Sequence, residues 1–430
     1  MSLSFIALLA VIAVGMTFRV PIAFALLAGG IVYLLVSGQD VGLVAEQVMT
    51  STYGNYVMLA VPLFILTANV MNAASITDRL WNAMSAMVGR FRGGDAHVTV
   101  MVNAAMSSMS GSALADAAGP GLLAVRQQIA RGYPPGFAVA VSAAAATLGP
   151  IIPPSIAMVL YCVIANTSIS AMFLGGIVPG LFISLTLMTT IAIVARWRGL
   201  PDGVKMSGSQ TVRALLNGIL PLTVPVVMLG GIWGGAFTPT EAAAIGGAYA
   251  MLLGFILFRT LKFSMLPAIF TESMRACVTV MLMIAGAFIV NYAVAAEHLG
   301  DLLAMSIIEM DLNAIQFLLI INVIFLLAGC FLDTTVLLLV VVPLLLPTVT
   351  VLGIDPVHFG VVIIVNIVIG LVTPPYGMLL FVLGSLTKTP VILIFKEVWV
   401  FIIPLILALL ALVLVPDIVL WLPNLVEGPR

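Results

Sequence analysis

Small hydroxyl side chains and a single carboxylate gather in one stretch of an otherwise apolar sequence. Residues 107–120 read SSMSGSALADAAGP, with Ser110 and Ser112 on either side of Gly111 and Asp116 as the charged residue. A charged side chain at membrane depth costs roughly 2.5–3.5 kcal/mol by insertion scales, and such residues commonly mark the path of a solute or an ion. Serine hydroxyls can hydrogen-bond a carboxylate or coordinate sodium. We expect this stretch to form the tip of a re-entrant hairpin at a solute-binding site.

Similar chemistry recurs near Asp333, which follows Gly329 between two apolar runs. Double prolines at 153–154 and 374–375 interrupt two further apolar runs. A proline lacks an N–H group and crowds the carbonyl four residues earlier in a helix. We therefore expect free backbone carbonyls at Gly149, Pro150, Gly370 and Leu371. Such uncharged oxygens suit a hard monovalent cation, and sodium is the expected ion.

The composition determines which elements must position these residues. Of 430 residues, 62% are hydrophobic and 8% are charged, and the mean hydropathy is +1.26. Ordinary soluble domains are about a quarter charged, so the chain is predicted to be an all-α polytopic membrane protein. The net charge of −1 and the absence of a basic run argue against a nucleic-acid partner. The three cysteines offer neither a disulfide framework nor zinc-ligand spacing.

Apolar runs predict the crossings, and we expect residues 2–18 to be a first helix rather than a signal peptide. Full crossings are predicted at 2–18, 20–36, 56–74, 137–164, 170–195, 214–236, 240–258, 272–293, 358–384 and 398–421. Two pairs, 97–110 with 113–125 and 314–329 with 334–347, are shorter. An arm of about 13 residues reaches only about 20 Å, so each pair is predicted to be a re-entrant hairpin. Residues 42–52 and 75–90 mix charged and apolar side chains and are predicted to lie at the interface.

A nearly constant offset relates the two halves of the chain. Asp116 and Asp333 are 217 residues apart, Asn103 and Asn322 are 219 apart, and the double prolines are 221 apart. We therefore predict two repeats, residues 1–205 and 214–430, joined by a cytoplasmic linker at 206–213. The first comprises scaffold helices (2–74), an arm helix (75–90), hairpin one (97–125) and a broken helix (137–164). The second comprises scaffold helices (214–293), hairpin two (314–347), a broken helix (358–384) and a last helix (398–421).

The distribution of basic residues predicts the orientation. Five full crossings in the first half require the second half to be inverted. With the N-terminus outside, every lysine and arginine except Arg430 lies on the cytoplasmic side, as the positive-inside rule demands. Hairpin one then enters from the cytoplasm and hairpin two from the opposite side. Inverted repeats with broken helices that meet at mid-membrane are typical of secondary transporters.

Simpler roles remain open for several of these residues. Asp116 and Asp333 are also suited to capping the second arm of each hairpin. The small residues around Ser110 would also suit close helix packing, and the double prolines would also suit packing kinks. Glu241 is expected to cap the helix at 240–258 rather than carry protons.

Six motifs together resemble the large membrane subunit of tripartite ATP-independent periplasmic (TRAP) transporters, the DctM-like family, over essentially the whole chain. The motifs are GSALADAAG (111–119), GYPPGF (132–137), GPIIPPSI (149–156), TPTEAAA (238–244), GIDPVHFG (353–360) and LVTPPYG (371–377). The resemblance implies an elevator-type, sodium-driven importer of a small organic acid (a dicarboxylate, keto acid or sugar acid). It implies a bacterial inner-membrane location with the N-terminus periplasmic.

The same resemblance implies partners and site residues. The partners would be a periplasmic substrate-binding protein and a small four-helix membrane subunit, expected to be a separate chain because no such helices precede residue 1. Membrane lipid would surround the subunit. The substrate would bind between the tips, at Ser110, Ser112, Asp116 and Asp333. Sodium would bind through Asn103, Ser107, Gly149, Pro150, Pro154, Gly329, Gly370 and Thr373.

Two other functions stay open at this point. One is a self-sufficient ion-coupled carrier of organic anions with the same architecture. The other is an intramembrane aspartyl protease, which needs two carboxylates close enough to share a proton. Asp333 lies in the context GCFLD (329–333) rather than the Gly-x-Gly-Asp of those enzymes. The sequence therefore favours a transporter over an enzyme.

Overall fold

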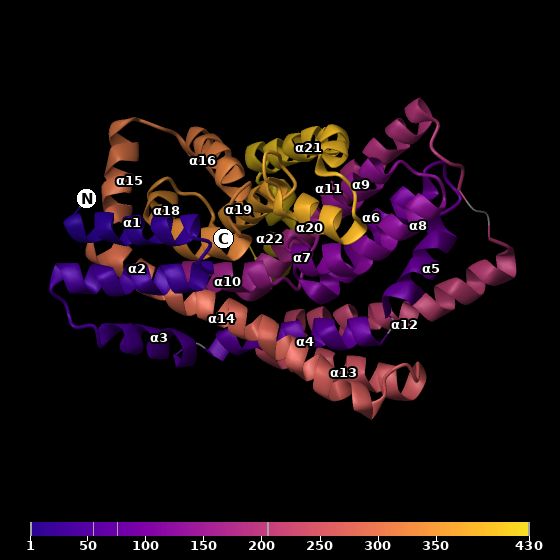
Figure 1. The fold of residues 1–430 in the computed structure, drawn as a ribbon, viewed down its shortest axis with the longest axis horizontal. Helices are drawn as coiled ribbons and strands as arrows, with labels where there is room; N and C mark the ends of the chain where they lie inside the picture. The colour runs from indigo at the N-terminus through magenta and orange to yellow at the C-terminus, as the bar shows by residue number, and fades with distance from the viewer. Residues whose placement is uncertain (1, 55, 75, 204–205, 429–430) are drawn as a thin grey trace.

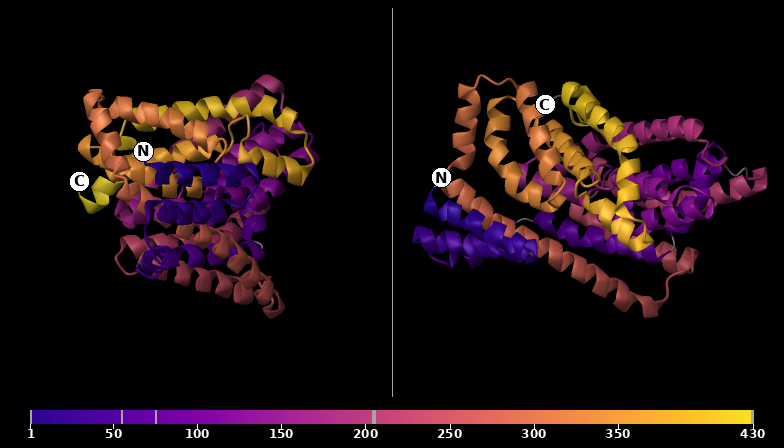
Figure 2. Two further views of the ribbon diagram at one scale, coloured as in Figure 1. Left: turned by 60° about the vertical axis from the view of Figure 1, so that its left-hand side comes forward. Right: turned by 45° about the horizontal axis from the view of Figure 1, so that its top comes forward.

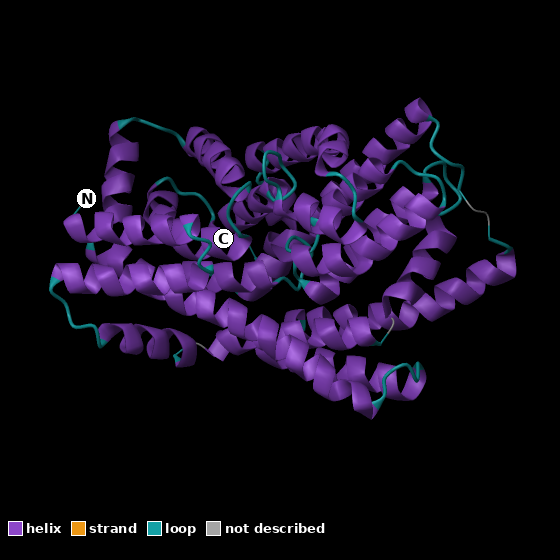
Figure 3. Ribbon diagram, viewed as in Figure 1, coloured by secondary structure: helices purple, strands orange, loops and turns teal. Residues whose placement is uncertain are grey.

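The computed structural model describes residues 2–54, 56–74, 76–203 and 206–428. Figure 3 shows helices joined by loops, and these ranges contain no strand. The all-helical class is therefore confirmed. Some predicted boundaries lie outside the described residues: residue 1, the start of the arm helix at 75, the end of the first repeat at 205, and residue 430. The predicted sides of Lys205 and Arg430 also lie outside them.

The first half of the chain forms eleven helices within the described ranges. They are α1 (Leu3–Thr17), α2 (Ile22–Ser37), α3 (Leu43–Tyr53), α4 (Ala60–Ala73), α5 (Ile76–Val88), α6 (Gly94–Ser110), α7 (Ala113–Asp116), α8 (Leu122–Ala130), α9 (Pro135–Ala146), α10 (Ile156–Ala165) and α11 (Ile169–Arg198). A 3₁₀ turn at Tyr56–Leu59 precedes α4. A π-helical turn at Ala117–Gly121 joins α7 to α8.

The second half forms another eleven helices in the described part of the chain. They are α12 (Gly208–Trp233), α13 (Pro239–Leu252), α14 (Leu266–Ala296), α15 (Leu299–Glu309), α16 (Ala314–Gly329), α17 (Thr334–Val336), α18 (Val342–Val351), α19 (Pro356–Gly370), α20 (Met378–Thr387), α21 (Val391–Leu414) and α22 (Asp417–Glu427). A π-helical turn at Leu253–Leu257 extends α13, and another at Leu337–Val341 joins α17 to α18. A 3₁₀ turn at Phe263–Met265 leads into α14.

Seven helical stretches in the described residues are long and apolar enough to cross a membrane. They are Tyr56–Ala73, Ile169–Arg198, Gly208–Trp233, Pro239–Leu257, Phe263–Ala296, Thr334–Val351 and Val391–Leu414. Shorter apolar helices, including α1, α2, α9, α10, α16, α19 and α20, accompany them. The chain is a multi-pass membrane protein.

The helices separate into two groups in space. Figure 1 shows α3, α4, α12, α13 and α14 along one side, and the helices of both predicted hairpins on the other. Both Figure 1 and the right-hand view of Figure 2 place the C-terminal helices between the hairpin of α16–α18 and the hairpin of α6–α8. The core lies at the broken helices, since α9 from Gly136 onward and α19 from Val357 onward are buried throughout.

Local sequence explains how the elements around the hairpins begin. Ser207 and Gln210 form a capping box at the start of α12, and Thr238 and Glu241 form one at the start of α13. Each pair satisfies two free backbone N–H groups at a helix start. Glu241 therefore caps α13, as the sequence indicated. The first capping box also shortens the predicted linker, because α12 already begins at Gly208 rather than at 214.

Several predicted bounds are wrong in instructive ways. The arms of the hairpins are longer than predicted: the second arm of hairpin one extends to Ala130, and that of hairpin two to Val351. A stretch of 18 residues such as 334–351 reaches about 27 Å, not 20 Å. Helix α15 lies between the predicted crossing at 272–293 and the first arm of hairpin two, in residues for which no element was predicted.

The predicted last helix at 398–421 is also wrong, because it is two helices. Helix α21 already begins at Val391, directly after Pro390, and it ends at Leu414. Val415 has φ −126° and ψ 82°, an extended conformation, and Pro416 follows it. A proline disfavours helical geometry in the residue before it, so the chain turns there and α22 starts afresh at Asp417.

Candidate functional site

The tip of hairpin one lies between α6 and α7. Gly111 has φ +61° and ends α6 in the left-handed region that favours glycine. A Cβ added at Gly111 would lie 3.0 Å from the carbonyl oxygen of Pro154 and 3.0 Å from the backbone nitrogen of Ile156. The tip therefore packs backbone to backbone against the break between α9 and α10. The prolyl bond of Pro154 in this break is cis, as is that of Pro375 in the other.

Asp116 lies inside this tip and is fully buried. Its Oδ1 accepts a hydrogen bond of 2.5 Å from the hydroxyl of Ser110, and its Oδ2 lies 3.3 Å from the hydroxyl of Ser107. The Ser107 hydroxyl also donates to the carbonyl oxygen of Asn103, at 2.6 Å. Asp116 thus joins the two arms of hairpin one rather than capping the second arm.

The tip of hairpin two is built differently. Asp333 is the N-cap of α17, and its Oδ1 accepts a hydrogen bond of 2.8 Å from the backbone N–H of Thr335. The carbonyl oxygen of Cys330 accepts a bond of 3.3 Å from the N–H of Gly377. A Cβ added at Gly370 would lie 2.7 Å from the backbone of Gly329. This tip therefore packs against the break between α19 and α20, and the capping role holds for Asp333.

A cleft of about 90 Å³ joins the two tips. From hairpin one it is lined by Gly111–Leu114, from hairpin two by Asp333–Thr335 and Leu338, and from the breaks by Pro150 and Leu371. Val280 of α14 and residues of α10 complete it. Sites for small molecules typically hold about 300–1,000 Å³, so this cleft must widen before a sugar acid can enter.

The cleft separates the four predicted substrate residues into two pairs. Ser112 and Asp333 line it from opposite tips. Ser110 and Asp116 are buried behind hairpin one, bonded to each other. The structure therefore brings Ser112 and Asp333 to one cavity. Ser110 and Asp116 do not line it, and instead hold together the hairpin that forms one of its walls.

The predicted sodium residues lie where each tip meets its break. A Cβ added at Gly149 would lie 2.7 Å from Oδ2 of Asp116 and 2.9 Å from the carbonyl carbon of Ser112. Gly149, Pro150 and Pro154 thus adjoin tip one, and Gly370 adjoins Gly329 of tip two. The hydroxyl of Thr373 is buried and donates to the carbonyl oxygen of Ile369 at 2.7 Å.

The prediction of free carbonyl oxygens at the two breaks is partly wrong. The carbonyl oxygen of Pro150 accepts a bond of 2.7 Å from the Ser155 hydroxyl. Those of Gly370 and Leu371 accept bonds of 3.0 Å and 3.1 Å from the N–H groups of Thr373 and Leu379. The chain leaves helical geometry at each break, so nearby donors reach these oxygens. A carbonyl oxygen has two lone pairs, so each of these oxygens still has one lone pair that could bind an ion.

Two buried side-chain oxygens of asparagine bear on whether a cation could bind near the hairpins and breaks. Oδ1 of Asn103 and Oδ1 of Asn366 are inaccessible to solvent and have no hydrogen-bond partner among the described residues. Buried polar groups without partners are uncommon and need an explanation. A hard cation is bound by oxygen, including amide carbonyl oxygen. The oxygens present at both breaks therefore suit sodium.

The sequence interpretation missed Asn366. Its Nδ2 donates to the backbone oxygen of Asn322 at 2.7 Å and also contacts Oδ1 of Asn322. This pair joins α16 of hairpin two to the broken helix α19. An available signal was a lone amide within the apolar run 357–370, where only an internal partner can satisfy it.

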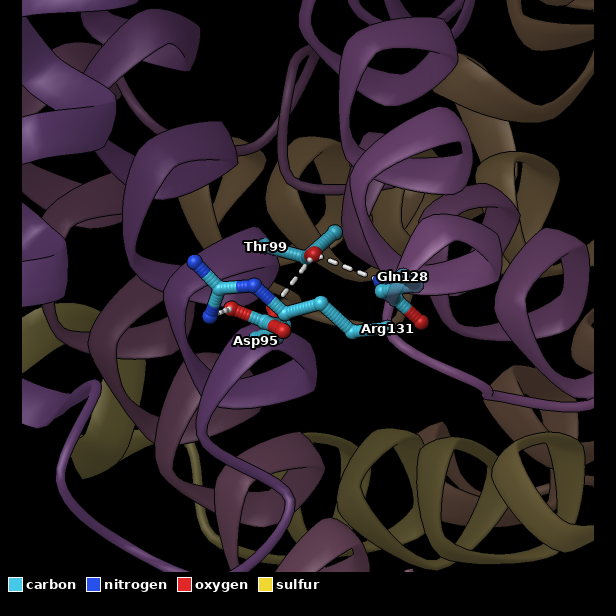
Figure 4. A network of polar contacts seen from close by, with 4 residues as sticks. All are labelled: Asp95, Thr99, Gln128 and Arg131. Carbon is cyan, nitrogen blue, oxygen red and sulfur yellow. Dashed lines mark hydrogen bonds and ion pairs between the residues drawn. The ribbon is translucent and has the colours of Figure 1, made fainter. Parts of the chain in front are cut away.

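A second polar network joins the arms of hairpin one at its base (Figure 4). Arg131 contacts Oδ1 of Asp95 at 2.6 Å, and Gln128 donates to the hydroxyl of Thr99 at 2.7 Å. The Thr99 hydroxyl in turn donates to the backbone oxygen of Asp95 at 2.8 Å. Burial raises the pKa of Asp95 above its ordinary value, and Arg131 partly offsets this. Polar bonds therefore link α6 to the second arm at both ends.

Comparisons with known proteins find similar sequences over nearly the whole chain. Residues 9–418 match the family model described as "Tripartite ATP-independent periplasmic transporter, DctM component". The chain is 37% identical over 408 residues to the sialic acid TRAP transporter large permease SiaM of Vibrio cholerae, with 95% of this chain and 96% of that one covered. It is 34% identical over 398 residues to the C4-dicarboxylate TRAP transporter large permease DctM of Pseudomonas aeruginosa, with 93% of each covered.

A solved structure shares the fold. The YdaH transporter of Alcanivorax borkumensis superimposes with a TM-score of 0.61 at 15% sequence identity. The match covers 85% of this chain and 86% of that one. At this identity the likeness concerns the fold alone.

Proposed function

We propose that this chain, which belongs to the DctM family of TRAP transporters, is the translocating subunit of a sodium-coupled importer. Its solute would be a small organic acid. The family is one of transporters and not of enzymes, so the aspartyl-protease alternative is wrong. The observation that carries the proposal is the cleft in which Ser112 of one hairpin tip faces Asp333, Thr334 and Thr335 of the other.

Paired features support an inverted repeat. The second arm of each hairpin starts with a short α-helical stretch and continues through a π-helical turn of five residues, at 117–121 and 337–341. Each hairpin tip then packs on a broken helix of its own half through a close approach at a glycine. Two hairpins with matching second arms, whose tips line one cleft, are the arrangement expected of inverted repeats that meet at a transport site.

Contacts between distant segments support the proposed topology, and the distribution of basic residues sets its direction, with the N-terminus periplasmic. On the proposed cytoplasmic side, Arg92 pairs with Asp202 at 3.7 Å, and Arg198 pairs with Glu397. On the proposed periplasmic side, Ser2 bonds Glu297, and Tyr292 donates to Gln39 at 3.0 Å. Each contact joins segments that this topology assigns to one side. The membrane is then the bacterial inner membrane, as the family implies.

The chemistry of the cleft suits a carboxylate with neighbouring hydroxyls. Hydroxyls of Ser112, Thr334 and Thr335 and the backbone N–H groups at the start of α7 are donors for an anion. Asp333 brings one negative charge, and an acidic solute therefore needs a cation nearby. We propose that sodium supplies it, bound at the two breaks by the oxygens of Asn103 and Asn366 and by backbone carbonyls. Inward movement of one positive charge gains about 2.3 kcal/mol per 100 mV.

The solute class and the partners follow by analogy. The two relatives carry sialic acid and C4-dicarboxylates by name, and both are called large permeases. We propose a small organic acid as solute, a small membrane subunit as partner, and a periplasmic binding protein that delivers the solute. An elevator movement of the hairpins and broken helices against α4, α12, α13 and α14 would carry the cleft across the membrane.

Uptake into liposomes tests the proposal. The chain is reconstituted with its small subunit, and labelled solute is supplied with or without the binding protein and an inward sodium gradient. We expect uptake only when both are present, and none when potassium replaces sodium. Undiminished uptake without the binding protein would favour the self-sufficient carrier instead.

A further inference from the structure

A groove outside the transport cleft lies between α11 and α21. These helices run side by side (Figure 1). The groove holds about 280 Å³ and is lined by Thr190, Ile193, Val194 and Trp197 of α11 and by Val400 and Pro404 of α21. Pro404 has no N–H group and cannot continue the helical hydrogen bonding at that point. This proline and the short side chains of Thr190, Val194 and Val400 leave a hollow at the surface between the two helices.

The exposed side chains at the groove place it at the membrane interface. Trp197 is 88% exposed although it is the largest apolar side chain of its helix, and Ile193 is also exposed. Tryptophan is enriched at the level of lipid headgroups. The helix continues only one residue further and ends at Arg198. The groove therefore runs from the headgroup level into the hydrocarbon.

Cations surround the same end of the groove. Arg198 also lines it, and its side chain is 41% exposed although one N–H group binds Glu397. An arginine has five N–H donors in a fork that matches a phosphate, so others stay available. Lys396 lies one helical turn before Val400 and hence on the same face of α21. Arg198 and Lys396 are therefore two cations against the carboxylate of Glu397.

We propose that this groove binds an anionic phospholipid, with an acyl chain between α11 and α21 and the phosphate held by Arg198 and Lys396. Basic pockets between membrane helices bind anionic headgroups because charge and hydrophobic burial act together. A zwitterionic lipid gains less from the excess of positive charge. The proposed orientation places the site in the cytoplasmic leaflet, but the binding itself does not depend on that orientation or on the transport function.

Lipid retention measures this binding directly. The chain is purified with its small subunit, and bound lipid is removed by washing in detergent. The complex is then incubated with phosphatidylglycerol or phosphatidylcholine, and native mass spectrometry measures how much lipid stays bound. We expect one phosphatidylglycerol to be retained at least fivefold more often than phosphatidylcholine. Val400→Trp, which fills the groove, and Lys396→Gln, which removes a charge, should each abolish this preference. Glu397→Gln should strengthen it, because it removes the opposing carboxylate and releases Arg198.

Matched variants separate this site from the general membrane surface. Leu185→Trp adds the same bulk at an exposed position of α11 outside the groove and should leave retention unchanged. Lys396 is exposed, so Lys396→Gln should fold. This variant still tests the proposal if Val400→Trp does not fold. Equal retention in wild type and Lys396→Gln, or no preference for phosphatidylglycerol, would overturn the proposal. A disulfide between Ile193→Cys and a cysteine in the small subunit would also overturn it, since a helix would then cover the groove.

Discussion

At the scale of single residues, the two aspartates have different surroundings. Asp116 is enclosed between Ser110 and Ser107, whereas Asp333 caps α17 and lines the cleft. One carboxylate therefore holds a hairpin together, and the other is available to a solute or an ion. Asp116 is the last residue of α7 and lies against the first arm, whereas Asp333 directly precedes α17 and can cap it.

Asp116→Ala should destabilise the protein more than it alters solute affinity. The substitution leaves the buried hydroxyl of Ser110 without its acceptor, which costs about 1–3 kcal/mol. We expect a lower Tm in detergent together with a lower maximal rate of uptake. Asp333→Ala, which removes one part-buried capping bond, should instead raise the KM for solute with a smaller shift in Tm. An unchanged Tm for Asp116→Ala with lost solute binding would mean that Asp116 touches the solute itself.

Arg131→Gln should destabilise hairpin one in a pH-dependent way. Burial already raises the pKa of Asp95, and loss of Arg131 raises it further because the ionised carboxylate loses its cation. A raised pKa in the folded state means that stability is lost as pH rises through that pKa. The variant should therefore match wild type most closely in acid and fall behind by about 1–3 kcal/mol near neutral pH.

Thermal unfolding across this pH range measures the difference. Arg92→Gln is the matched control, since Arg92 also pairs with an aspartate, Asp202, but the two side chains are 49% and 88% exposed. The control should stay close to wild type throughout. A penalty for Arg131→Gln that does not change with pH would show that packing, not charge, holds the arms together.

At the scale of elements, each tip and its break form one interlocked unit. The backbones of tip one and the first break touch at Gly111 and Gly149, and those of tip two and the second break touch at Gly329 and Gly370. No side chain fits between them. This close approach places the oxygens of the breaks beside the tips, where a coupling ion could tie the two together.

Gly149→Ala should therefore abolish transport. Its Cβ would lie 2.7 Å from Asp116 and 2.9 Å from the backbone of Ser112, distances that force the tip away from the break. Gly119→Ala is the control, because nothing lies within 4 Å of its added Cβ in the same hairpin. We expect sodium-dependent uptake to be lost in the first and kept in the second at equal expression. Wild-type uptake by Gly149→Ala would contradict the interlocked arrangement.

The sequence predicts elements whose signals are local. The glycine turn at 111, the double-proline breaks and the capping of α13 by Glu241 are all read from neighbouring residues. What it misses depends on contacts between distant segments. Asn322 and Asn366 are 44 residues apart and pair only after folding, and the Ser110–Asp116 bond replaces the expected opening of Asp116 to the cleft. The second arms of the hairpins continue beyond their predicted ends at 125 and 347, because the helices persist past Arg126 and Pro347.

At the scale of the whole molecule, the helices divide into a long-helix side and a side with both hairpins (Figure 1). The α4, α13 and α14 group contacts the cleft chiefly through Val280. The rest of the cleft wall comes from the hairpins, the breaks and α10. In the proposed elevator movement, the two tips would keep their mutual positions while the cleft changes sides.

Labelling of single cysteines tests the proposed orientation. In a background without Cys162, Cys277 and Cys330, a membrane-impermeant maleimide should label Glu309→Cys in whole cells. It should label Ser209→Cys only after the cells are permeabilised. Both positions are exposed in the structure, so burial does not decide the outcome. Labelling of both in intact cells, or the reverse pattern, would contradict the orientation.

The division between buried and cleft-facing residues at the tips also bears on how such permeases diversify. Ser110 and Asp116 are buried and bonded to each other, whereas Leu114 and Thr335 are half-buried and line the cleft without closing this contact. Under the proposed transport function, folding of the tip and solute preference would then depend on largely separate side chains. Substitutions at Leu114 and Thr335 would cost less stability than substitutions at the buried pair, so a lineage could change its nutrient without rebuilding its transporter.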